Sequence, residues 1–176
     1  SANQQVRVNS AGNALEFATI SSGGVAQVIQ SNLLTKTSTS STTYTDVGLQ
    51  AQITPSSSSH KILVFMDASG SSAGNSSGHL RIMRDSTQLR VPSSSGSRIQ
   101  NMSGGIDNAD TPSDGIAGIT SIFLDSPNST SQLTYKVQIR QGGGGSTTYF
   151  NRSTADGDGV NTGVAGSSLI LMEVTV

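Results

Sequence analysis

The chain lacks several residue types on which particular classes of protein depend. It has no cysteine, so disulfide bonds and thiol chemistry are excluded, and this fits assembly in a reducing cytoplasm. It has no tryptophan, four phenylalanines and three tyrosines, which leaves few large side chains to anchor a core. Burial between subunits would help such a chain of 176 residues, and we therefore expect a homo-oligomer.

Charged residues and long apolar runs are also scarce. Only 12% of the residues are charged, the net charge is -1, and the ten lysines and arginines are dispersed along the chain. This distribution offers no basic patch for a nucleic acid and no basic run for a membrane surface. No apolar run approaches the roughly 20 residues of a membrane span, so we expect no membrane insertion.

Strict alternation of apolar and polar residues is the main structural signal. In the segment 133–140, Leu133, Tyr135, Val137 and Ile139 share one face, which predicts a half-buried antiparallel strand. Similar alternation recurs along the chain, and the run 61–66 is apolar throughout, which predicts a central strand covered on both faces. About eight strands at a spacing of roughly ten residues predict an all-β antiparallel β-sandwich, of jelly-roll or immunoglobulin-like topology.

The N-terminal residues differ from the rest. Residues 5–20 predict a small hairpin, because alternating pairs flank the turn residues 10–13. The flexible stretch 21–24 then marks a boundary, so we predict a linking and anchoring segment over 1–24 and a β-sandwich domain over 25–176. The spacing of apolar residues in 25–33 permits a short helix, but its β-branched content favours an extended connector.

Loops and the final strand complete the predicted organisation. Residues 68–78 and 102–118 predict long polar loops. The glycines 142–145 predict an exposed hairpin tip and not a phosphate cradle, since no lysine follows the last glycine. In the last strand we assign Ile170 and Met172 to the core, which leaves Leu169 and Leu171 on the outer face as a candidate oligomer interface.

Acidic loops are the candidate metal sites. Asp107, Asp110 and Asp114 lie in one loop, and Asp156 and Asp158 lie in another. Calcium is bound through six to eight oxygen ligands, which such loops could supply. Neither loop fits the full EF-hand pattern, so we favour solvated acidic residues, and no other cofactor is expected.

One short cluster has the composition of a sugar-binding site. Tyr149, Phe150, Asn151 and Arg152 place aromatic rings beside polar side chains that could bind a glycan. The alternative, which we favour, is that Tyr149 or Phe150 fills the core from its strand.

No catalytic constellation stands out. The chain lacks a G-x-S-x-G elbow, and serine is so abundant that a match to a Ser-His-Asp arrangement is uninformative. His60 and His79 are the only histidines, whereas a zinc site needs about four ligands, so we interpret both as surface residues. We expect no enzymatic activity.

Several phrases resemble those of bacteriophage structural proteins. The phrase GNALEFATI at 12–20 is similar to a linker found in phage tail-fibre and tail-spike proteins. The segment 41–64 resembles the opening of a β-sandwich domain in structural proteins of marine phages. The segments 124–140, 150–153 and 167–174 are similar to the closing half of that domain, so the resemblance covers nearly the whole chain.

This resemblance implies a virion protein assembled in the host cytoplasm. A tail fibre or appendage of this kind is usually a homotrimer that attaches to the host surface through a glycan or protein. It would bind other virion proteins through its N-terminal segment, and no catalytic residues come with the family. Two alternatives remain open: a capsid head-fibre or decoration protein, and a carbohydrate-binding module of a bacterium.

Overall fold

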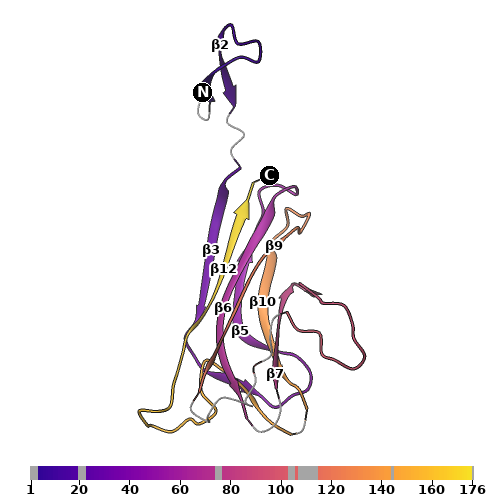
Figure 1. Cartoon of the computed structure of the whole chain (residues 1–176), viewed down its shortest axis with the longest axis vertical. Coiled ribbons are helices and arrows are strands. Elements are labelled where there is room, and N and C mark those ends of the chain that lie inside the picture. The colour runs from indigo at the N-terminus through magenta and orange to yellow at the C-terminus, as the bar shows by residue number, and fades with distance from the viewer. Residues whose placement is uncertain are drawn as a thin grey trace.

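The computed structural model describes residues 4–19, 23–73, 77–102, 106, 115–143 and 145–175. These residues form strands and no helix, and two antiparallel sheets lie face to face (Figure 1), which confirms the predicted all-β sandwich. The strands are β1 (Gln4–Val8), β2 (Leu15–Thr19), β3 (Val25–Leu33), β4 (Thr37–Thr39), β5 (Thr45–Ile53), β6 (Lys61–Ser72), β7 (Gly78–Arg84), β8 (Thr87–Gln88), β9 (Ala117–Asp125), β10 (Leu133–Gln141), β11 (Thr148–Phe150) and β12 (Ser167–Val174).

The strand order is that of a jelly roll. One sheet has the order β3-β12-β6-β9, and the short strands β11 and β4 extend it beside the C-terminal part of β6. The other sheet has the order β5-β10-β7-β8. The antiparallel pairs β7·β8, β6·β9, β5·β10 and β3·β12 are nested along the chain, as in a long ribbon wound over both sheets. This winding distinguishes the jelly roll from the immunoglobulin-like alternative.

Alternating side chains from both sheets fill the core. The inward residues of β5 include Leu49 and Ile53, and those of β10 include Tyr135 and Val137, all of them buried. The predicted core face of β10 is therefore confirmed. Burying one face of each antiparallel strand supplies the main driving force for folding of the sandwich.

The structure corrects two predictions about β6. This strand is central, since it pairs with β12 on one side and β9 on the other, but it continues to Ser72 into the predicted loop 68–78. Its outward residues Leu63 and Phe65 are only half-buried, so one face of the strand is covered by the core and the other is not. An apolar run alone does not reveal which face lacks a neighbour.

The face assignment of β12 was wrong. Leu169 and Leu171 are fully buried in the core, whereas Ile170 and Met172 point outward and are half-buried. The register explains this outcome, because Leu171 lies opposite Val64 of β6 and must share its inward face. Leu169 and Leu171 are therefore core residues and cannot form an interface on the outside of the subunit.

The segment after β10 also differs from the prediction. The described glycines 142, 143 and 145 do not close a hairpin, because β11 pairs with β4 and β6 in the opposite sheet. Residues 25–33 form the edge strand β3, so the extended interpretation was correct and the helix was not.

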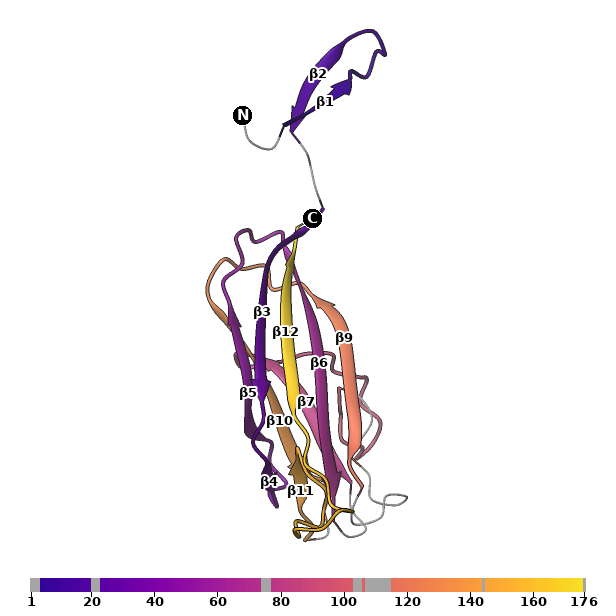
Figure 2. The ribbon, with the colours of Figure 1, turned by 90° about the vertical axis from the view of Figure 1, so that its left-hand side faces the viewer.

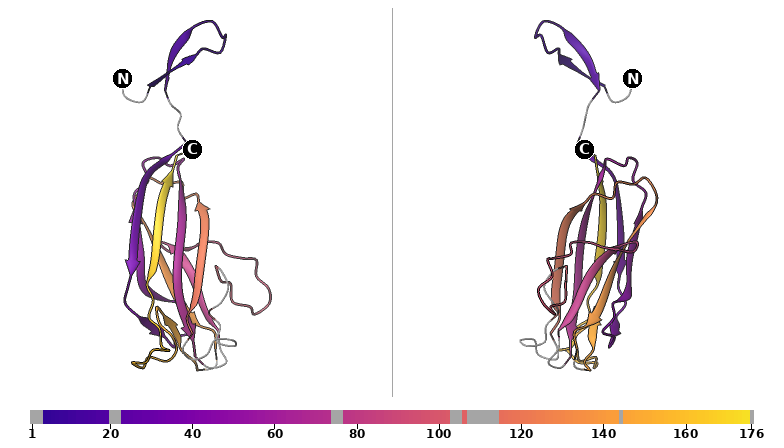
Figure 3. Two further views of the ribbon diagram at one scale, coloured as in Figure 1. Left: turned by 60° about the vertical axis from the view of Figure 1, so that its left-hand side comes forward. Right: turned by 90° about the vertical axis from the view of Figure 1, so that its right-hand side faces the viewer.

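The predicted N-terminal hairpin is confirmed. Strands β1 and β2 pair antiparallel, with Val6 opposite Phe17 and Val8 opposite Leu15. The views in Figure 1 and Figure 3 place this hairpin beyond the end of the sandwich at which β12 ends. The hairpin and the loops after β11 therefore lie at opposite ends of the molecule (Figure 2).

Candidate functional site

The end of the sandwich far from the hairpin carries β4, β11 and the segment that joins β11 to β12 (Figure 2). Asn151 sets the direction of this segment, since it adopts a left-handed conformation with φ 62 directly after β11. Its side-chain amide donates to the carbonyls of Leu33 and Thr35 at 2.8 and 3.0 Å, and its Oδ1 accepts from the Ser167 hydroxyl. Asn151 thereby joins three segments and is itself buried.

Two of the four predicted glycan-binding residues therefore serve the fold. Asn151 is occupied by these internal hydrogen bonds, and Phe150 is fully buried in the core. Tyr149 and Arg152 point the other way, and the Arg152 guanidinium stacks over the Tyr149 ring at 4.0 Å from its centre. Phe150 therefore fills the core, as the favoured interpretation predicted for one of the two aromatic residues, and Tyr149 does not.

Asp156 joins this pair to a second segment. Lys36 Nζ, in the connection between β3 and β4, donates to Asp156 Oδ1 at 2.6 Å, and Arg152 Nη1 lies 3.0 Å from Oδ2. The hydrogen bond from Lys36, with the nearby Arg152 charge, holds the pKa of Asp156 below its ordinary value of 3.8. The carboxylate is therefore ionised at neutral pH and bridges two cations.

A pocket opens beside this bridge. It has a volume of about 340 Å³, and its lining consists of Lys36, residues 155–159 and residues 162–164. A neighbouring hollow of about 350 Å³ is more apolar and shares Lys36 and Val164 with it. Pockets of this size can hold a small ligand, and ammonium, carboxylate and backbone groups suit a ligand rich in hydroxyls.

The structure does not bring together a metal site in its described part. Asp156 is already paired with two cations, which would compete with calcium, and no three His, Cys, Asp or Glu side chains gather among the described residues. Asp107, Asp110 and Asp114 lie outside the described residues.

A second cluster was not anticipated from the sequence. The Arg81 guanidinium stacks 4.0 Å from the centre of the Tyr44 ring, and Arg140 lies 5.7 Å from it. The Tyr44 hydroxyl donates to Asn101 at 3.2 Å, and Asn101 contacts His79 Nδ1 at 2.7 Å. Burial, with the charge of Arg140, lowers the pKa of His79. These residues are far apart in the sequence, so no local pattern announces the cluster.

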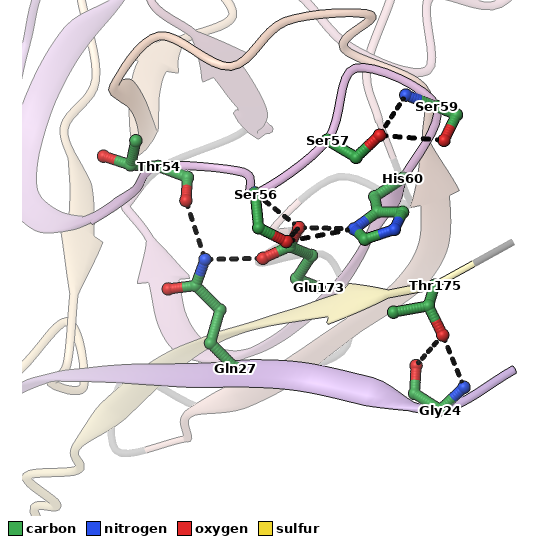
Figure 4. A network of polar contacts seen from close by, with 9 residues as sticks. All are labelled: Gly24, Gln27, Thr54, Ser56, Ser57, Ser59, His60, Glu173 and Thr175. Atoms are coloured by element: carbon green, nitrogen blue, oxygen red, sulfur yellow. Dashed lines mark hydrogen bonds and ion pairs between the residues drawn. The ribbon is translucent and has the colours of Figure 1, made fainter. Parts of the chain in front are cut away.

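The other histidine belongs to a buried network near the hairpin end (Figure 4). The carboxylate of Glu173 is fully buried and accepts hydrogen bonds from Gln27 and from both the backbone N–H and hydroxyl of Ser56. Its Oε1 lies 2.6 Å from His60 Nδ1. Burial disfavours the charged carboxylate, but these hydrogen bonds outweigh it and lower its pKa to about 2.

This network does not have the geometry of a catalytic triad. In a triad the serine and the acid bind opposite nitrogens of the imidazole. Here the Ser56 hydroxyl donates to Glu173 and lies 3.3 Å from the same Nδ1 that faces the carboxylate. The arrangement ties the loop before β6 to β12 and β3. Both histidines are half-buried, which differs from the surface position expected for them.

Comparison with known proteins does not assign the chain to a family. No protein-family model matches the chain, and no curated protein sequence matches it. Among the described residues, no helix has the length and apolar character needed to cross a membrane.

Proposed function

We propose that the chain is a non-enzymatic bacteriophage virion protein, a trimeric tail fibre or appendage that attaches to the host surface. The resemblance of residues 12–20, 41–64, 124–140, 150–153 and 167–174 to phage structural proteins supports this proposal. The jelly roll is compatible with it, because viral capsid and lectin domains share this architecture. Fold alone does not define a function, whereas the two ends of the molecule carry features that bear on it.

The observation that carries the proposal is the opposition of an apolar hairpin and a polar pocket. At one end, Val6, Val8, Leu15 and Phe17 share one face of the hairpin and are largely exposed. A two-stranded hairpin is marginally stable alone, so this face requires a partner such as the remainder of a virion fibre. At the other end, the pocket beside Lys36 and Asp156 is available for a ligand.

The pocket supplies the chemistry for a host glycan. Carboxylates and backbone carbonyls of residues 156–159 accept hydrogen bonds from sugar hydroxyls, while Lys36 donates to ring or carboxylate oxygens. The Tyr149 ring of β11 stacks on Arg152, which pairs with Asp156 of the pocket lining. Three weak contacts on one fibre, and several fibres on one particle, would raise the avidity far above the affinity of a single pocket.

Binding of the whole chain to an array of bacterial surface polysaccharides tests this proposal. We expect the unmodified protein to bind a subset of glycans, and Lys36→Ala to bind at least tenfold more weakly. Lys136→Ala is the matched control, since Lys136 forms a similar exposed ion pair with Asp46 on the opposite sheet. Equal binding by both variants, or no glycan bound at all, would overturn the assigned site.

A capsid head fibre is the second candidate, because the same apolar hairpin could insert into a capsid shell. Labelling intact particles with an antibody against this chain separates the two: label at the tail supports the proposal, and label over the head supports the alternative. A bacterial carbohydrate-binding module would share the pocket but would leave particles unlabelled.

A further inference from the structure

The outer faces of the two sheets differ in chemistry. The outward side chains of β5, β10 and β7 are mostly polar, and they include Gln50, Gln52, Lys136, Arg140 and Arg81. This is the composition of a sheet face that contacts water. The outward face of β3-β12-β6-β9 is instead apolar over the half nearest the hairpin.

The register arranges these apolar residues in rows across the sheet. One row contains an apolar residue from every strand: Val28 of β3, Met172 of β12, Leu63 of β6 and Leu124 of β9. The four strands lie side by side in front of the second sheet in Figure 2.

The next row is almost as apolar. It contains Ile170, Phe65 and Ile122, with Gln30 at the edge on β3. Together with Val25, these two rows form a continuous surface, which we call the apolar face.

The apolar face is exposed in the single chain. Val28 and Ile122 retain 53% and 55% of their accessible surface, and Leu124 retains 48%. Monomeric proteins seldom expose continuous apolar patches larger than about 300–600 Å², and larger ones mark interaction surfaces. Burial of this face would be favourable at about 25 cal/mol per Å² of apolar area.

We propose that the apolar face is buried against other copies of this chain. In a symmetric oligomer, residues near the axis meet their own copies, so a charged residue there would face a like charge. The two apolar rows contain no charged residue. The charged residues on the outer side of β6, Lys61 and Asp67, have opposite signs and lie in the rows directly before and after these two.

The face supplies part of an interface. Its two rows and Val25 span four strands at about 4.8 Å and about six residues at about 3.3 Å, which gives roughly 20 by 20 Å, or about 400 Å². A standard interface takes about 800 Å² from each partner. The apolar hairpin adds surface at the same end of the molecule, and parallel packing of the subunits would bring the hairpins together. The inference rests on the proposed function only for the number of subunits.

Sedimentation velocity of the full chain tests the proposal at micromolar concentrations. We expect an oligomer for the unmodified protein, and for Ile122→Lys a dissociation constant raised about a hundredfold or more, because the interface would bury an unpaired charge. Thr120→Lys is the control, since Thr120 is exposed on the same side of β9 but lies beyond the apolar rows. A monomeric parent protein, or equal association by both variants, would overturn the proposal.

Disulfide cross-linking tests the same contact between subunits without a substitution that weakens their association. Because the chain has no cysteine, Leu63→Cys introduces a single reporter in the centre of the apolar face. We expect oxidation to link two chains for Leu63→Cys and not for Gln52→Cys, whose position is exposed on the opposite sheet. The absence of a link in Leu63→Cys would count against contact at the axis. The mass of the assembly tests the trimer separately, and neither result depends on glycan binding.

Discussion

The imidazole Nδ1 of His60 lies 2.6 Å from Glu173 Oε1, although the two residues are 113 positions apart. The contact joins the loop before β6 to the last strand at the end of the sandwich nearest the hairpin. Because Glu173 is fully buried and its hydrogen bonds lower its pKa to about 2 from 4.5, its ionised form belongs to the folded state. This residue therefore links stability to pH.

The protein is expected to lose stability in acid, because the stabilising effect of ionised Glu173 is lost there. A carboxyl whose pKa is lower in the folded than in the unfolded state stabilises the fold above the unfolded value. That stabilisation should be lost as the pH falls from about 4.5 toward about 2. Urea unfolding across this range should show the decline, and Glu173→Gln should show a weaker one.

At neutral pH, Glu173→Gln should lower the free energy of unfolding by about 1–3 kcal/mol, because hydrogen bonds to a buried charged group are lost. Glu16→Gln is the control, since Glu16 pairs with Arg7 on the exposed hairpin and such pairs contribute little. A Glu173→Gln variant as stable as the parent would contradict a structural role for the network.

Replacement of Asn151 should separate hydrogen bonding from backbone conformation. Asn151→Gly removes the hydrogen bonds to Leu33 and Thr35 and should cost about 2–4 kcal/mol. Asn151→Ala removes the same bonds and also strains the left-handed backbone, so it should cost about 1 kcal/mol more. Urea unfolding measures both values, and an alanine variant more stable than the glycine variant would disprove the conformational part.

Local alternation predicts a strand and its faces when only one set of residues is apolar. In β10 the apolar set of Tyr135 and Val137 alternates with polar side chains, and the predicted face was correct. In β12 both sets are apolar, since Leu169 and Leu171 alternate with Ile170 and Met172. The choice between them depends on the neighbouring strand β6, and that pairing is not visible in the sequence of β12.

The candidate site was less predictable than the fold for a similar reason. Lys36 and Asp156 are 120 positions apart and meet only because the jelly roll brings the start of β4 beside the segment after β11. The sequence drew attention to the contiguous residues 149–152, of which Phe150 and Asn151 proved structural. Contiguity along the chain is a poor guide where strands cross between sheets.

Tyr135 should resist ionisation while the protein is folded. Burial, with a hydrogen bond to Asp125 at 2.6 Å, raises the pKa of Tyr135 far above its ordinary value of 10.0. A raised pKa means that this contribution to stability is complete below pH 10 and declines above it. Alkaline titration followed by tyrosinate absorbance should be the same for the folded parent and Tyr135→Phe.

The unfolded proteins supply the control for this titration. In denaturant the parent should show one more ionising tyrosine than Tyr135→Phe, and a difference already present in the folded proteins would contradict the prediction. The substitution itself should cost about 1 kcal/mol, since the ion pair between Arg84 and Asp125 stays in place.

Two glycines at one end of the pairing of β6 and β9 should differ sharply in their tolerance of a side chain. A Cβ on Gly70 would lie 2.6 Å from the backbone carbonyl oxygen of Tyr149, whereas a Cβ on Gly118 would meet nothing within 4 Å. Gly70→Ala must therefore displace β11, and it should lower the free energy of unfolding by about 1–3 kcal/mol. Gly118→Ala should change it by less than about 0.5 kcal/mol.

The same pair of variants tests how the fold positions the pocket. Displacement of β11 moves Tyr149 and the start of the segment that carries Asp156, so Gly70→Ala should also weaken any glycan binding of the folded protein. Gly118→Ala lies on the far side of β6 from β11 and should bind as the parent does. Gly70→Ala should thus lower both the stability toward urea and the glycan binding, whereas Gly118→Ala should leave both unchanged. Equal behaviour of the two variants would contradict the close approach of β6 and β11.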